Sequence, residues 1–172
     1  MDINIFKGYK MRNYKQLPIP DSVWQKPTHF IAFGLGSGTF PFAPGTFGTL
    51  MAIPFYLAMQ PLSPLHYFIL LVIITVGSMW LCDKVSKEIN VHDHPGMCLD
   101  EIVGYLVTMM GAPFGLGWII LGFILFRIFD ILKPWPIGFI DKKIHGGFGM
   151  IMDDVMAGIY SLILIRILSW MV

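Results

Sequence analysis

The chain has 172 residues, of which 55% are hydrophobic and only 13% are charged, and its mean hydropathy is +0.67. Ordinary soluble domains carry roughly 25% charged residues, so the composition predicts a membrane protein. A net charge of +1 provides no basic patch, which argues against a nucleic-acid partner. No repeat or linker divides the chain.

The first 28 residues form a polar, mainly basic leader. They lack the apolar core and the small-residue cleavage pattern of a secretory signal. Its basic residues are Lys7, Lys10, Arg12, Lys15 and Lys26. The positive-inside tendency therefore predicts a cytoplasmic amino terminus. We expect one membrane-embedded domain over residues 29–172.

A glycine-rich segment, residues 33–49, comes before the first apolar arm. Glycine allows close backbone approach, and free N–H groups at a helix start can hold an anion. A phosphate-binding loop here would use Gly36, Ser37, Gly45, Thr46 and Thr49. The segment lacks the GK[ST] ending of a P-loop. Tight packing of one helix beside another explains the glycines equally well.

Two hairpins are predicted next. Residues 65–82 carry no formal charge and approach the about 20 residues needed to cross the hydrocarbon core. A shorter apolar arm at 47–59, interrupted by Pro54, precedes them, and the turn at 60–64 joins the two arms. Residues 102–129 are apolar but are broken at 111–117, so they predict a second hairpin, either spanning or re-entrant. A last helix is expected from about residue 155 to 171.

These elements predict an all-α fold, a small polytopic membrane helical bundle with about four to five membrane-embedded helices and a broken hairpin. Each hairpin returns the chain to its starting side, so residues 83–101 and 127–154 should both face the cytoplasm. The two cysteines, Cys82 and Cys98, are expected to be free thiols.

All nine acidic residues beyond the leader fall in these two cytoplasmic segments, so they can meet at one membrane face. We expect Asp100-Glu101 to open one helix and Asp153-Asp154 to open another. Carboxylates in a first helical turn are also favoured by capping and by the helix dipole, which is a purely structural explanation. Asp130 is costly beside an apolar helix unless it is paired or functional.

Several carboxylates near one another suit Mg²⁺, which also binds substrate phosphate. Cationic side chains nearby could neutralise that phosphate. Arg127 lies three residues before Asp130 and shares its helix face, although a structural ion pair would explain this spacing as well. The other cationic candidates are Lys133, Lys142 and Lys143. The sequence His92-Asp93-His94 suggests a transition-metal site only weakly.

Four ordered motifs make a more specific pattern. They are GLGSG with APGTFGTL over 34–50, LDEIVG at 99–104, FRIFDILKPWPI at 126–137 and GGFGMIMDDVMAG at 146–158. Together they resemble the phosphatidylglycerophosphatase A family over about residues 29–165. The resemblance implies a Mg²⁺-dependent phosphatase of the bacterial inner membrane, multi-pass and with its active site facing the cytoplasm. It would convert phosphatidylglycerophosphate to phosphatidylglycerol in phospholipid biosynthesis, in the lipid bilayer and without an obligatory protein partner.

The residues that match the motifs are those that the charge distribution isolates. Metal ligands are expected among Asp100, Glu101, Asp130, Asp153 and Asp154. The expected catalytic group is Asp130, Asp153, Asp154, Arg127 and Lys133, with Arg127 and Lys133 as phosphate clamps. Water or an aspartate as nucleophile, and one ion or two, both remain open.

Two other classes of protein fit parts of the pattern. A small metal-ion or proton-coupled transporter would line a pathway with intramembrane carboxylates, and a structural membrane subunit would need none of them. The acidic residues gather at one face and are nearly absent from the apolar stretches. This distribution favours an enzyme with a surface site over a conduit.

Overall fold

The computed structural model describes residues 17–171, and within that range it contains α-helices and short 3-10 helices but no strand. This confirms the all-α class. The basic leader residues Lys7, Lys10, Arg12 and Lys15 lie outside the described residues. The helices are α1 (Pro27–Ala32), α2 (Pro44–Met59), α3 (Pro64–Ile89), α4 (Leu99–Thr108), α5 (Leu116–Leu132), α6 (Ile137–Lys143) and α7 (Gly146–Ser169).

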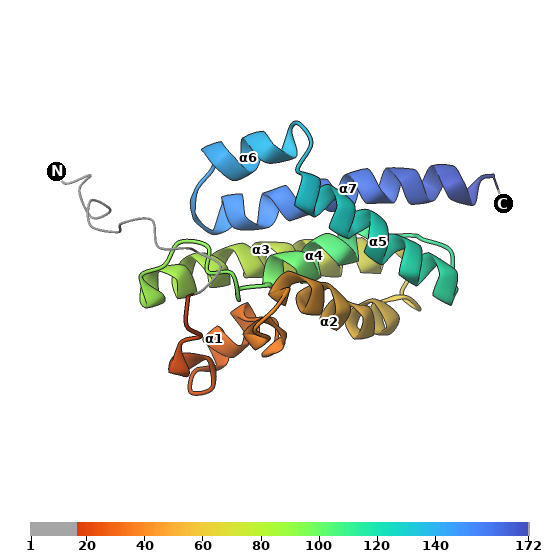
Figure 1. The fold of residues 1–172 in the computed structure, drawn as a ribbon. Coiled ribbons are helices and arrows are strands. Elements are labelled where there is room, and N and C mark those ends of the chain that lie inside the picture. Colours follow the sequence, from red (N-terminus) through yellow and green to blue (C-terminus); the bar gives the residue numbers. More distant parts are fainter. Residues whose placement is uncertain (1–16, 172) are drawn as a thin grey trace.

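Helix α4 lies at the centre of the bundle and contacts α2, α3, α5 and α7 (Figure 1). All of its residues from Ile102 to Thr108 are buried. A Cβ added at Gly104 would lie 2.7 Å from the carbonyl oxygen of Asp154, and one added at Gly158 would touch the Gly104 carbonyl oxygen. Small residues therefore let α4 and α7 pack closely. This contact holds the start of α4 beside the middle of α7.

Two helices, α3 and α7, are long and apolar enough to cross a membrane by length and composition. Helix α3 contains the predicted span 65–82, and only 22% of its most apolar window is buried. Most of its exposed apolar side chains recur at helical spacing and form one stripe: Leu65, Phe68, Ile69, Val72, Ile73, Val76 and Trp80. Such a stripe is suited to lipid. A total of four to five membrane-embedded helices stays a prediction.

Both predicted hairpins are present. Helices α2 and α3 are joined by the turn at residues 60–63, and Pro54 lies inside α2 without ending it. Helix α4 ends at Thr108 and α5 begins at Leu116, so the apolar stretch is broken where the sequence indicated. The break contains Gly111 and Gly115 at φ values of +70° and +144°, which other residues rarely adopt. Cys82 and Cys98 are free and buried, as expected.

The expected start of the last helix was wrong. Helix α7 begins at Gly146, so Asp153 and Asp154 lie about two turns inside it and do not open it. Added Cβ atoms at Gly147 and Gly149 would collide with backbone carbonyl oxygens of Met79 and Ile144. These glycines therefore serve close packing within a helix, in a segment that lies before the predicted start of that helix. First-turn capping cannot explain the two aspartates.

Candidate active site

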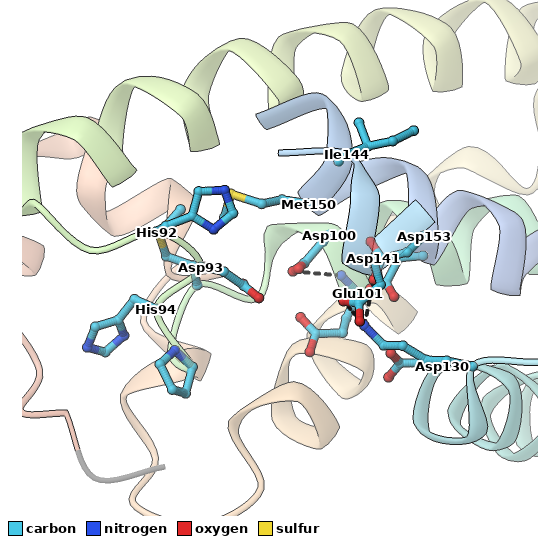
Figure 2. A pocket seen from close by; sticks show the side chains of 15 residues that line it. His92, Asp93, His94, Asp100, Glu101, Asp130, Asp141, Ile144, Met150 and Asp153 are labelled. Atoms are coloured by element: carbon cyan, nitrogen blue, oxygen red, sulfur yellow. Dashed lines mark hydrogen bonds and ion pairs between the residues drawn. The ribbon is translucent and has the colours of Figure 1, made fainter. Parts of the chain in front are cut away.

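A polar pocket of about 210 Å³ lies at the end of the bundle where α4 and α7 begin and α5 ends. We call it the acidic pocket. Figure 2 shows acidic side chains from α4, α5 and α7 gathered on one side of the acidic pocket. The loop at residues 92–94, which we call the histidine loop, lies on the other side. Its charged lining residues are Asp93, Asp100, Glu101, Asp130, Lys133, Asp141, Asp153 and Asp154. All five predicted metal-ligand candidates are thus brought together.

Three of these carboxylates form the tightest group. Asp100, Glu101 and Asp154 each offer an oxygen, and these oxygens all lie within 4.8 Å of one another. Burial, followed by the charge of neighbouring carboxylates, raises the pKa of both Asp100 and Glu101 well above the ordinary range. Glu101 Oε2 is buried without a hydrogen-bond partner. A bound divalent cation would offset this concentrated negative charge, so the donor set fits Mg²⁺.

Arg127 and Asp130 form an ion pair on one face of α5, as their spacing predicted. The Arg127 Nη1 also lies 3.7 Å from Glu101 Oε1. The side chains of Arg127 and Asp130 are mostly buried, with 17% and 13% of their surfaces exposed. The Asp130 carboxylate therefore faces the acidic pocket while bound to a neighbouring cation, which lowers the cost of its burial.

Lys133 is the cation inside the acidic pocket. It caps the carboxyl end of α5 in a left-handed conformation, with φ at 43°. Its Nζ donates to Asp153 Oδ2 and to Asp141 Oδ1, each at 2.7 Å. Burial lowers the pKa of Lys133, but the two carboxylates outweigh burial and raise it above its ordinary value. The ammonium group is therefore fully charged at neutral pH.

Asp141 is a site residue that the sequence did not identify. It lies on α6, a short helix that was not predicted, and it lines the acidic pocket beside Lys133. In the sequence Asp141 stands next to Lys142 and Lys143, and such a run of charges is typical of a solvent-exposed helix face. Those two lysines are exposed and do not line the acidic pocket.

In the histidine loop, the Asp93 carboxylate is a better candidate for the chemistry of the site than the two imidazoles. His92 Nε2 accepts from the Gly146 amide, and His94 Nδ1 accepts from the Gly96 amide, each at 3.0 Å. The other ring nitrogen of His94, Nε2, lies 3.4 Å from the Pro18 carbonyl oxygen, so both histidines hold the backbone. Asp93 lies between them with φ at 54° and lines the acidic pocket. This arrangement favours the structural explanation of the two histidines.

The glycine-rich segment lies beside the acidic pocket and contributes no wall to it. The hydroxyl of Ser37 donates to the Gly34 carbonyl, and that of Thr49 donates to the Gly45 carbonyl. The position of a Cβ at Gly36 faces the rings of Phe30 and Trp24. Substrate binding by Gly36, Ser37, Thr46 and Thr49 stays a prediction.

Gly45 differs from these residues because it is buried against the charged groups. A Cβ at this position would collide with Glu101 Oε1 and lie 3.0 Å from Arg127 Nη1. The first turn of α2 therefore rests directly on the Glu101 and Arg127 side chains. A side chain larger than hydrogen would displace one of them.

Comparison with known proteins gives a consistent result. The model of the family described as Phosphatidylglycerophosphatase A matches residues 30–169. Phosphatidylglycerophosphatase A of Escherichia coli (strain K12) is 42% identical over 78% of this chain and 79% of its own. The Haemophilus influenzae protein of the same name is 38% identical over 84% and 91% of the two chains.

A Bacteroides thetaiotaomicron protein, provisionally named a phosphatidylinositol-3-phosphatase, is 37% identical over 83% of this chain and 93% of its own. No solved structure matches significantly. The family model covers most of the chain, and it includes every carboxylate of the acidic pocket. The chain therefore belongs to the phosphatidylglycerophosphatase A family.

Proposed function

We propose that this lipid phosphatase hydrolyses phosphatidylglycerophosphate to phosphatidylglycerol and phosphate, with Mg²⁺ bound in the acidic pocket. Family membership indicates the reaction. The observation that carries the proposal is the convergence of Asp100, Glu101 and Asp154, from two helices, within 4.8 Å beside the Lys133 ammonium. Carboxylates for a cation next to a group for phosphate are what hydrolysis of a phosphomonoester requires.

The relatives' names point to the reacting group. Phosphatidylglycerophosphate and phosphatidylinositol 3-phosphate both carry a phosphomonoester on a polyol, which a phosphodiester joins to diacylglycerol. The polyols differ, whereas both lipids share the diacylglycerol, the phosphodiester and the monoester, and the monoester is the group that a phosphatase removes. We therefore place that monoester in the acidic pocket.

Asp100, Glu101 and Asp154 would hold the ion. Asp130 and Asp153 line the same pocket beside them. A bound Mg²⁺ supplies Lewis-acid polarisation of phosphate oxygens and lowers the pKa of a coordinated water. Lys133 is held in place by Asp141 and Asp153 and supplies positive charge to the transferring phosphate.

Asp153 is our candidate for the general base. Its Oδ2 accepts from Lys133, whereas its Oδ1 is buried without a hydrogen-bond partner among the described residues. The free oxygen can take a proton from the attacking water if it lies within hydrogen-bond reach. Lys133 keeps the carboxylate oriented while this happens.

We place the acidic pocket at the cytoplasmic face of the bacterial inner membrane, in a multi-pass chain. The lysines near that end of the bundle, Lys84, Lys87, Lys142 and Lys143, agree with the positive-inside tendency. The apolar stripe of α3 would face lipid. A lipid substrate would then reach the acidic pocket sideways from the inner leaflet, with its acyl chains remaining in the bilayer.

The test is phosphate release from phosphatidylglycerophosphate by the detergent-purified protein, with Mg²⁺ or with excess EDTA. We expect release only with Mg²⁺, loss of release in Asp130→Asn, and retention in Asp21→Asn. The control makes the same substitution in the first turn of an amino-terminal 3-10 helix, outside the acidic pocket. No release by folded wild type would contradict the proposal. Ion flux in proteoliposomes without phosphate release would instead support the transporter alternative.

A further inference from the structure

A second cavity meets the acidic pocket at Glu101. It is a groove of about 840 Å³, bordered by residues 17–19, by the loop at 38–45 and by the end of α5. We call it the Arg127 groove. Glu101, His94 and Pro95 line both cavities. One bound molecule can therefore extend from one cavity into the other.

The two cationic side chains of α5 are divided between these cavities. Lys133 lines the acidic pocket and not the groove, whereas Arg127 lines the groove and not the acidic pocket. Their positions are six residues apart in the chain, which corresponds to about 9 Å along a helix axis. The protein thus presents two separate positive positions rather than one clamp.

Arg127 retains hydrogen-bonding capacity beyond its ion pair with Asp130. Its Nε is buried and has no hydrogen-bond partner among the described residues. A guanidinium group has five N–H donors and stays charged at all relevant pH values. Unused donors on a charged group beside a cavity favour an anionic oxygen ligand.

The outer walls of the groove are apolar. The side chains of Phe40 and Ile131 are 45% and 67% exposed. Phe40 stacks on Phe47 with ring centroids 3.9 Å apart, which fixes its position on the loop. A charged inner end with apolar walls beyond it suits an amphipathic anion better than a free sugar phosphate.

We propose that the Arg127 groove binds the phosphodiester of the substrate lipid and the glycerol end of its diacylglycerol, with Arg127 at the diester and Lys133 at the terminal monoester. This inference rests on the proposed function. In phosphatidylglycerophosphate a single glycerol separates the two phosphates, so one molecule supplies an anion for each cation. Arg127 is then a specificity residue that distinguishes this lipid from one with a monoester alone.

The test compares two lipids in the same mixed micelles. Phosphatidylglycerophosphate has both phosphates, whereas phosphatidic acid has only the monoester. We expect Arg127→Gln to raise KM for phosphatidylglycerophosphate at least about 10-fold, the effect of one charge-assisted contact, with a much smaller change in kcat. Because Arg127 also pairs with Asp130, the kcat/KM of this variant for phosphatidic acid should fall too, but at least about 10-fold less than its kcat/KM for phosphatidylglycerophosphate. Lys133→Gln should lower kcat/KM for both lipids. Equal losses for both lipids in Arg127→Gln would overturn the inference.

A second pair of variants keeps the test decisive if Arg127→Gln does not fold. Ile131 lines the groove, whereas Ile128 is also exposed on α5 and does not line it. Ile131→Gln should raise KM for phosphatidylglycerophosphate but not for soluble glycerol 3-phosphate, and Ile128→Gln should change neither. Equal effects of the two variants would contradict the inference.

The two proposals fail in different ways. If folded wild type releases phosphate from no substrate, the proposed function is wrong. If it hydrolyses phosphatidic acid and phosphatidylglycerophosphate with equal kcat/KM, the function stands and the role of the Arg127 groove is wrong.

Discussion

The two ends of the bundle both contain a cavity, but the cavities differ in chemistry. The acidic pocket has a volume of about 210 Å³ and is lined by seven carboxylates and one lysine. The far cavity, at the opposite end beside the α2–α3 turn, is larger at about 380 Å³, and Arg166 is its one charged lining residue. Volume therefore does not single out the acidic pocket. The convergence of carboxylates from separate helices identifies the site.

Two polar side chains of the far cavity have structural contacts. The Tyr67 hydroxyl donates to the Leu106 carbonyl at 2.8 Å, which joins α3 to α4. The Arg166 guanidinium packs on Gly111 in the turn between α4 and α5. No carboxylate lines this cavity, so it offers nothing to hold a divalent cation. Substitutions in the acidic pocket should therefore lower activity, and substitutions in the far cavity should leave it nearly unchanged.

The largest expected effect is at Asp154. Asp154→Asn removes one of the three carboxylates within 4.8 Å and should lower kcat/KM for phosphate release by about 10²- to 10³-fold or more, the scale of losing one preorganised electrostatic group. Arg166→Gln, at the far cavity, should leave release within about 2-fold of wild type. The comparison between the two ends fails if Arg166→Gln is the more damaging variant in initial-rate assays at saturating Mg²⁺.

A smaller difference is expected within the acidic pocket. Lys133→Ala removes the positive charge and leaves Asp153 without its partner, so phosphate release should fall by about 10- to 100-fold. Asp141→Asn keeps a hydrogen-bond acceptor on the more exposed side of Lys133 and should cost only about 2- to 5-fold. Steady-state kinetics of both variants and of the double variant checks this order. A double variant no worse than Lys133→Ala would show that Asp141 acts through the lysine.

The third expected effect concerns stability, and it separates packed glycines from exposed ones. A Cβ at Gly104 would collide with the Phe126 ring and the Asp154 backbone, so Gly104→Ala should destabilise the protein by about 1–3 kcal/mol. Gly77, on α3, has no atom within 4 Å of its Cβ position, so Gly77→Ala should be neutral or slightly stabilising. Thermal unfolding in one detergent measures both. Equal stability of the two variants would mean that the contact between α4 and α7 is looser than described.

Buried glycines also show which features of the fold cannot be predicted from the sequence alone. The span in α3, the broken hairpin and the pairing of Arg127 with Asp130 follow from hydropathy, glycine and proline positions and helical spacing. The start of α7 does not, because Gly147 and Gly149 resemble loop residues until their contacts with Met79 and Ile144 are known. Tertiary packing overrides local propensity at such positions.

Within the site, the sequence identified residues by their charge and could not assign partners. Asp100, Glu101 and Asp154 were expected near one another, and the structure brings them together. Asp141 was missed because its partner, Lys133, is eight residues away across an unpredicted turn and helix. Lys133 and Arg127 were both expected to be phosphate clamps, and the structure shows that they line different cavities. These distinctions depend on three-dimensional proximity, which no local pattern encodes.

The smallest expected effect is on the stability of the protein, and it depends on the carboxylates of the acidic pocket. Asp100 and Glu101 have raised pKa values in the folded protein, so the native state binds more protons than the unfolded state. Without metal, stability should therefore fall as pH rises above the ordinary carboxyl pKa of about 4, which a comparison of two samples, one mildly acidic and one near neutral, can detect. Mg²⁺ competes with these protons, so the increase in Tm on adding Mg²⁺ to EDTA-treated protein should be larger at the higher pH, by a few degrees, at about 2–4 °C per kcal/mol. In Glu101→Gln both the pH dependence and the Mg²⁺ effect should shrink, whereas in Arg166→Gln both should persist. If Mg²⁺ raises Tm equally at both pH values, the ion binds away from the buried carboxylates, and the difference between the two ends of the bundle would not reflect cation binding.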